Sequence, residues 1–112
     1  MAYITYSRNR GNSRMLEACK LIAEMTANPR LARRGRRSIR GMIKKALFEG
    51  NQKVILVSGR EEMRASVIKI KGSGDDYAWQ STYSIKLKAG KLQFLGGDSR
   101  DAKARFAKDA ED

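Results

Sequence analysis

The chain has 112 residues, 41% of them apolar, with 24 Lys plus Arg against 12 Asp plus Glu and a formal net charge of +12. This length is typical of a single domain with one small core. The chain contains no His, which excludes Ser-His-Asp triads, Cys-His pairs and the usual zinc sites.

The single cysteine, Cys19, cannot form an intramolecular disulfide, which fits a reducing compartment. The amino-terminal residues lack the basic and apolar pattern of a secretory signal, and no run approaches the roughly 20 apolar residues of a membrane span. We therefore expect a cytoplasmic protein with no membrane partner. Cys19 lies on the apolar face of a predicted helix, where we expect it to be buried.

The positive charge is concentrated in the first part of the chain. Residues 1–72 contain 17 basic and 5 acidic side chains, which is the whole excess, whereas residues 73–112 contain seven of each. A local excess of this kind attracts anionic partners such as nucleic acid. The sequence therefore predicts that residues 1–72 carry the binding surface.

The first elements follow from the apolar pattern. Residues 3–7 alternate and predict a strand, and a polar loop follows. Ser13 is a candidate N-cap for a helix that runs to about residue 26, in which apolar residues recur at helical spacing. Pro29 ends that helix. Residues 31–34 predict either a short strand or an extended connector.

The middle of the chain predicts a second helix and then a buried strand. Ser38 is a second N-cap candidate, and the apolar stripe that follows it ends at Gly50, a C-cap-like position. Residues 53–58 include four consecutive apolar residues, a pattern typical of a strand covered on both faces in a sheet flanked by helices. Residues 64–71 predict the next strand.

The residues after the following turn predict antiparallel pairing. Residues 79–88 alternate between apolar and polar side chains, which is typical of a strand with one face in the core, and Tyr83 belongs to the apolar set. The dipeptide Ala89-Gly90 then leads into residues 91–95 and predicts a hairpin.

Residues 98–112 form a charged C-terminal tail with Ala residues and one large apolar anchor, Phe106. This composition leaves the tail as either helical or disordered. We expect residues 1–97 to form a single α/β domain, a two-layer sandwich with a mixed sheet.

Arginines are clustered where the second helix is predicted to begin. Arg presents a planar fork of donors that matches phosphate and stacks on bases. The backbone N–H groups and the helix dipole after Ser38 would reinforce a phosphate site. The candidate contacts are Arg30, Arg33, Arg34, Arg36, Arg37, Arg40, Lys44 and Lys45. The alternative is a solvated basic surface that pairs with carboxylates of the same chain.

A second basic group lies in the loop between the first predicted strand and the first predicted helix. In open α/β sheets, the loops at the carboxyl ends of strands form the usual ligand site. The candidate contacts in this loop are Ser7, Arg8, Arg10, Ser13 and Arg14. The spacing matches neither a Walker loop nor a dinucleotide fingerprint, so a nucleotide-dependent enzyme is not predicted. The alternative is an exposed polar loop capped by Ser13.

Aromatic side chains offer a further route to RNA, because exposed rings stack on unpaired bases. The available residues are Tyr3, Tyr6, Tyr77, Trp79 and Tyr83. Aromatic residues on strands more often belong to the core, so most of them are expected there.

Two adjacent carboxylate pairs, Glu61-Glu62 and Asp75-Asp76, are the candidates for a metal site. Neighbouring side chains on a turn usually point apart, so a metal-dependent nuclease built from them is not predicted. We expect no catalytic residue, no metal and no cofactor.

A family resemblance rests on the order of these features. In chain order the pattern is a strand, Ser7-Arg8, a basic loop ending Ser13-Arg14, a helix, Arg34-Gly35, a Ser-capped helix ending Phe48-Glu49-Gly50 and the buried strand Val54 to Val57. Over about residues 3–71 this order resembles the Brix-domain proteins of ribosome biogenesis, especially their short archaeal members.

The resemblance implies an α/β domain similar to the anticodon-binding domains of class IIa aminoacyl-tRNA synthetases and a role in processing or assembling ribosomal RNA. Position by position, it supports Ser7, Arg8, Ser13 and Arg14, and it adds the Arg34-Gly35 turn, as RNA contacts. We expect a non-enzymatic RNA-binding protein whose partners are ribosomal RNA or its precursor and ribosome-assembly proteins. The alternative is a protein-interaction module whose basic face binds an acidic partner.

Overall fold

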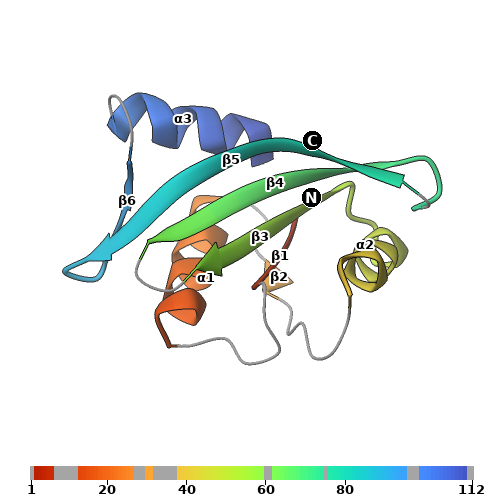
Figure 1. Ribbon diagram of the computed structural model, residues 1–112, viewed down its shortest axis with the longest axis horizontal. Helices are drawn as coiled ribbons and strands as arrows, with labels where there is room; N and C mark the ends of the chain where they lie inside the picture. Colours follow the sequence, from red (N-terminus) through yellow and green to blue (C-terminus); the bar gives the residue numbers. More distant parts are fainter. Residues whose placement is uncertain are drawn as a thin grey trace.

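The computed structural model describes residues 2–6, 13–26, 30–31, 38–59, 62–74, 76–95 and 99–110. Within these ranges, six strands form one sheet and three helices pack against it (Figure 1). The elements in chain order are β1 (Ala2–Tyr6), α1 (Ser13–Met25), β2 (Arg30–Leu31), α2 (Ile39–Phe48), β3 (Lys53–Gly59), β4 (Met63–Lys71), β5 (Asp76–Lys88), β6 (Lys91–Phe94) and α3 (Ser99–Ala110). No helix in these ranges is long and apolar enough to cross a membrane.

The sheet is mixed, with the strand order β2-β1-β3-β4-β5-β6. β1 runs parallel to both β2 and β3, whereas β3 to β6 are antiparallel neighbours. Parallel neighbours need a crossover connection, and α1 and α2 lie in the crossovers from β1 to β2 and from β2 to β3. The predicted α/β fold with a mixed sheet is confirmed. The two predicted layers are not, because helices pack on both faces of the sheet and the structure therefore has three layers.

α1 and α3 pack against one face of the sheet. The apolar residues of α1 recur at helical spacing, and alternate residues of β3, β4 and β5 meet them from the sheet. The fully buried members include Ile4, Ile22, Ile55, Val67, Ile85 and Phe106. Cys19 is also fully buried here, as predicted, and burial raises the pKa of its thiol to about 12.

α2 packs against the opposite face, over one end of the sheet (Figure 1). Its buried residues Met42, Ile43 and Ala46 meet alternate residues of β3 and β4. Ser38 caps the helix as predicted, because its Oγ accepts a hydrogen bond from the Gly41 N–H at 3.1 Å. Since helices cover β3 from both sides, its first five residues are all buried, as its apolar run predicted.

The hairpin of β5 and β6 is also confirmed. Ala89 and Gly90 have positive φ angles of 52° and 75°, as the favoured two-residue hairpin turn requires. Lys88 pairs with Lys91 across this turn. The turn therefore sets the register in which β6 joins the edge of the sheet.

One irregularity changes the faces of β5. Val67 of β4 lies opposite Ser81, but Ile68 lies opposite Trp79, so Gln80 is an extra residue on β5. Such a β-bulge interrupts the regular alternation of side chains along the strand. After the bulge, the odd-numbered residues of β5 face α1 and α3, whereas before it they face α2.

Residues 99–110 of the charged tail are helical and pack on the sheet as α3. Phe106 is fully buried against the rings of Tyr83 and Phe94, with centroid distances of 5.4 and 5.1 Å. The Tyr83 hydroxyl donates a hydrogen bond to the Asp109 carboxylate. Lys53 Nζ donates another to the Asp109 backbone oxygen at 2.6 Å. α3 thus shares one core with β5, β6 and α1.

Candidate nucleic-acid interface

α2 covers one end of its sheet face (Figure 1). Exposed side chains of β4 and β5 continue that face beyond the helix. We call this surface the open face. Its members are Arg64, Trp79, Thr82, Ser84, Lys86 and Lys88, all of them exposed.

The strand register places these residues on one side of the sheet. Trp79 lies opposite a residue of the α2 core, and Arg64 lies opposite Ser84. Thr82 lies opposite Ser66, and their hydroxyl oxygens are 3.2 Å apart in a hydrogen bond. Because directly opposed residues of paired strands share a face, the open face is continuous across β4 and β5.

Lys86 and Lys88 extend the open face along β5. They alternate with Ile85 and Leu87, which are buried on the α1 and α3 side. Residues 77–97 contain three lysines and no acidic residue. Although residues 73–112 carry equal numbers of basic and acidic side chains, residues 77–97 within them are positively charged. The charge totals for the two parts of the chain did not reveal this.

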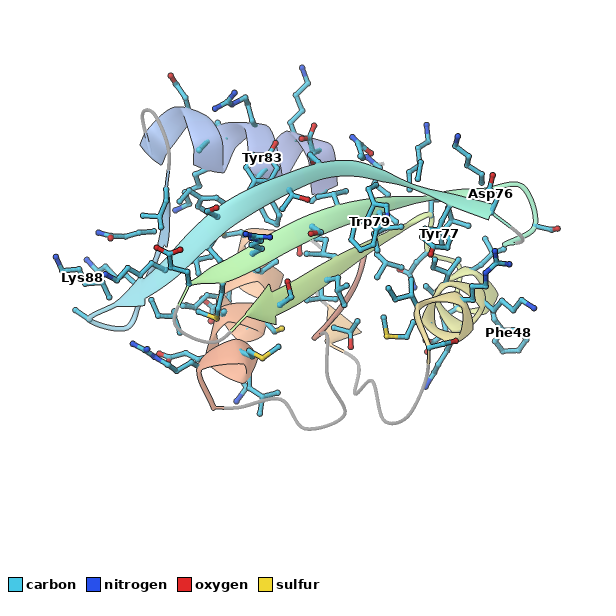
Figure 2. All side chains as sticks on the ribbon, in the orientation of Figure 1. Phe48, Asp76, Tyr77, Trp79, Tyr83 and Lys88 are labelled. Carbon is cyan, nitrogen blue, oxygen red and sulfur yellow. The ribbon has the colours of Figure 1, made fainter. Side chains whose placement is uncertain are left out.

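Trp79 is the aromatic residue of the open face, and 51% of its surface is exposed. Its ring meets the ring of Tyr77 edge to face at a centroid distance of 6.5 Å, and Tyr77 packs against the α2 core. Figure 2 shows both rings on the α2 side of β5 and Tyr83 close to α3. As expected for aromatic residues on strands, Tyr83 packs against the core, and Tyr77 does so in part. Trp79 lies at the surface.

One carboxylate borders the open face. Glu62 lines an open pocket together with Arg64 and Ser84, next to the connection between β3 and β4. Its side chain is exposed, so water screens its attraction to the neighbouring guanidinium. Among the described residues, the open face is therefore positively charged, with the Glu62 carboxylate at its border.

The predicted carboxylate pairs are not brought together in the described part of the chain. Glu62 precedes β4, whereas Asp76 lies opposite Lys71 at the other end of that strand. Glu61 and Asp75 lie outside the described residues. Among the described residues, no group of three or more His, Cys, Asp or Glu side chains is arranged to hold a metal ion.

α2 carries the described part of the predicted arginine cluster. Arg40 and Lys44 are exposed and Lys45 is half-buried. The first turn of α2 contains no acidic residue, so no side chain there offsets the positive end of its dipole. Because α2 packs on the face that includes the open face, these three side chains and the open-face lysines belong to the same side of the sheet.

α1 carries Arg14, which is exposed in the first turn of the helix. This turn also lacks an acidic residue. Since α1 and α2 pack on opposite faces, Arg14 and Arg40 belong to helices on opposite sides of the sheet.

The remaining predicted contacts are not placed by the structure. Ser7, Arg8, Arg10, Arg33, Arg34, Gly35, Arg36 and Arg37 lie outside the described residues. Ser13 begins α1 and Arg30 begins β2, and their side chains also lie outside the described part.

The sheet topology nevertheless places side by side the two strands that precede the predicted basic stretches 7–12 and 32–37. β1 and β2 are parallel neighbours, with Ile4 opposite Leu31, so their carboxyl ends lie at the same edge of the sheet. The stretches 7–12 and 32–37 follow directly from these two ends. In open α/β sheets, ligands bind at the carboxyl ends of the strands.

The sequence reading missed the basic residues of the open face: Arg64, Lys86 and Lys88. Lys86 and Lys88 lie in the part of the chain whose basic and acidic side chains balance, and Arg64 is an isolated arginine that follows two glutamates. The alternation of residues 79–88 is the signal that could have found two of them, because it separates Lys86 and Lys88 from the buried side chains.

Comparison with known proteins reveals a structural likeness. The crystal structure of a probable ribosomal biogenesis protein from Aeropyrum pernix K1 has a similar fold, with a TM-score of 0.61 at 17% sequence identity. The match covers 76% of this chain and 47% of that one, so this chain spans about half the length of its structural neighbour. No protein-family model matches the sequence, and neither does any curated protein.

Proposed function

We propose that this chain is a non-enzymatic RNA-binding protein that acts in ribosome biogenesis in the cytoplasm, in the processing or assembly of ribosomal RNA. The resemblance to Brix-domain proteins supports this role. So does the fold, which is similar to that of a probable ribosomal biogenesis protein. The net charge of +12 supports an anionic partner.

One observation carries the proposal. The arginine-rich stretch 32–37 and the basic stretch 7–12 follow from neighbouring carboxyl ends of two parallel strands. One RNA bound at this edge of the sheet would reach the two strand ends from which these stretches continue, although the stretches are far apart in the sequence. Arg binds phosphate with two parallel hydrogen bonds, so contacts to the phosphate backbone of the RNA would supply most of the affinity.

The salt dependence of binding to fragments of precursor ribosomal RNA tests this proposal. Neutralising roughly six phosphates gives a slope of log affinity against log salt of about −4 on single strands and about −5 on duplex. We expect a slope in this range. A slope near zero would show that phosphate contacts do not drive binding.

A charge variant locates the contacts. Replacing Arg33, Arg34, Arg36 and Arg37 with Gln should weaken binding to all RNA sequences and reduce the slope by about 1 for each lost phosphate contact. The matched control replaces Lys103 and Lys108, two exposed lysines of α3, and should bind RNA like the unmodified chain.

The role in ribosome biogenesis needs a test in cells. Crosslinking the protein to RNA and sequencing the attached fragments should enrich precursor ribosomal RNA. Fragments scattered over the transcriptome without such enrichment would contradict the role and leave general RNA binding.

A protein-interaction module is the second candidate, and one observation favours it. Phe48 at the end of α2 is 92% exposed, and exposed large apolar side chains are frequent at protein interfaces. Treating a cell lysate with nuclease separates the candidates. Partners that co-purify equally well after the treatment would favour a direct acidic protein partner over RNA.

A further inference from the structure

We infer that the open face binds single-stranded RNA, with an unpaired base stacked on Trp79 and the adjoining phosphates held along β5. This inference rests on the proposed function, because it specifies the form of RNA and a second surface that holds it. It concerns residues outside the arginine-rich stretches on which the proposed function depends.

Trp79 provides the stacking surface. About half of its side chain is exposed, while the neighbouring ring of Tyr77 supports it edge to face at 6.5 Å. Tyr77 is in turn held by the α2 core. The indole is thus supported from one side and accessible from solvent. Every base has a π-face, so such a ring binds unpaired bases with little preference for sequence.

The cationic side chains of β5 follow Trp79 along the same face. Lys86 and Lys88 are two residues apart, which places them about 7 Å apart along the strand. The distance from Trp79 to Lys88 along the strand is about 30 Å, long enough for several nucleotides of an extended RNA. Thr82 and Ser84 lie between them and present hydroxyl groups, which donate hydrogen bonds to phosphate and sugar oxygens.

The chemistry of the open face favours RNA over a protein partner. The other members of the open face are hydroxylic or cationic, whereas the centres of protein interfaces are depleted in charge and rich in apolar groups. Residues 77–97 have no acidic side chain, so this part of the hairpin repels no phosphate. The positive charge of the open face therefore favours a polyanionic partner. The exposed indole of Trp79 favours a nucleic acid among polyanions, because it can stack on a base.

The same features favour single strands over duplex. In a paired helix the base faces are covered by their stacked neighbours, and the deep major groove of A-form RNA does not admit side chains. An indole at the surface gains a stacking partner from an unpaired base. Duplex RNA would be restricted to the phosphate contacts of Arg64, Lys86 and Lys88.

The fluorescence of the unmodified chain tests the inference, because Trp79 is its single tryptophan. The titrants are a short oligouridylate, a short oligoadenylate, a fully paired RNA duplex of the same length and inorganic polyphosphate. Both single strands should quench the Trp79 emission in proportion to binding. Duplex and polyphosphate should bind without comparable quenching, because neither offers a base to the indole.

Substitutions provide the second readout. Trp79→Ala should weaken binding of the single strands about 5- to 150-fold, while Trp79→Phe should retain most of the affinity. The matched control is Phe48→Ala, which removes an aromatic ring that is 92% exposed on the outer side of α2 (Figure 2). Binding by this control should equal that of the unmodified chain.

The outcomes separate the inference from the proposed function. If RNA binds with the expected salt dependence but the emission is unchanged and Trp79→Ala binds like Phe48→Ala, the open face is not the site and the proposed function stands. If no RNA binds, both fail. If Trp79→Ala does not fold, the quenching of the unmodified chain and the affinity of Trp79→Phe decide.

Discussion

Trp79 and Tyr83 lie four residues apart in one strand, yet their side chains lie on opposite faces of the sheet. In a regular strand two residues at this spacing share a face. The extra residue Gln80, which has no partner on β4, reverses the alternation between them. As a result, Tyr83 packs with α3, whereas Trp79 is exposed beside α2.

Deleting Gln80 tests this relationship. Without the bulge, Trp79 would directly precede Ser81, and simple alternation would still place these two side chains on opposite faces. We therefore expect a folded chain in which acrylamide quenches Trp79 as efficiently as before. Gln80→Ala, which keeps the bulge, is the control. A blue-shifted emission protected from acrylamide would mean that the deletion moves the indole into the core.

Phe106 should account for much of the docking energy of α3. Its ring is fully buried against Tyr83 and Phe94, so Phe106→Ala should lower the free energy of unfolding by about 3 to 5 kcal/mol through lost burial and a cavity. Phe48→Ala makes the same chemical change at an exposed site and should cost less than about 0.5 kcal/mol. Urea unfolding measures both. Equal effects would contradict the docking of α3.

The Tyr83 hydroxyl should make stability depend on alkaline pH. Partial burial, followed by the hydrogen bond to Asp109 and the negative charge of that carboxylate, raises the pKa of Tyr83. The unfolded chain therefore loses this proton at a lower pH than the folded chain. The contribution is complete below the ordinary tyrosine pKa of about 10 and is lost as the pH rises through the raised value.

Urea unfolding of the unmodified chain and of Tyr83→Phe, between about pH 8 and about pH 11, isolates this effect. Every other ionisable group is present in both chains, so the difference between them reports Tyr83. We expect the stability of the unmodified chain to fall more steeply with pH. Parallel profiles would show that the hydroxyl is not engaged by Asp109.

Cys19 should resist alkylation in the folded chain. It is fully buried, and burial raises the pKa of its thiol to about 12, so roughly one thiol in ten thousand is ionised at pH 8. We expect iodoacetamide to label it after unfolding in guanidinium and hardly at all before. Mass spectrometry measures the labelled fraction. Rapid labelling of the folded chain would contradict the packing of α1.

Much of the fold can be predicted because its signals are local. Ser38 is a cap because its hydroxyl reaches an N–H three residues on. The apolar run of β3 predicts cover on both faces, and Ala89-Gly90 predicts the hairpin. The tail after residue 97 could not be assigned in this way, because what makes α3 pack is the contact of Phe106 with rings on β5 and β6.

The candidate site divides in the same way. Net charge and the clustered arginines indicate an anionic partner from composition alone. The relation between stretches 7–12 and 32–37 depends on the parallel pairing of β1 with β2. The open face depends on the register of β4 against β5, which places Arg64 opposite Ser84. Neither pairing has a signal within a short window of sequence.

The sequence by itself determined the class of the fold, most element boundaries and the sign of the partner's charge, because periodicity, capping and charge are carried by neighbouring residues. The tertiary structure decided which surface presents which groups. It divided the helices between the faces of the sheet, docked α3, and placed Trp79 and Tyr83 on opposite faces through one unpaired residue. Strand pairing and bulges depend on contacts between distant segments, which no local pattern encodes.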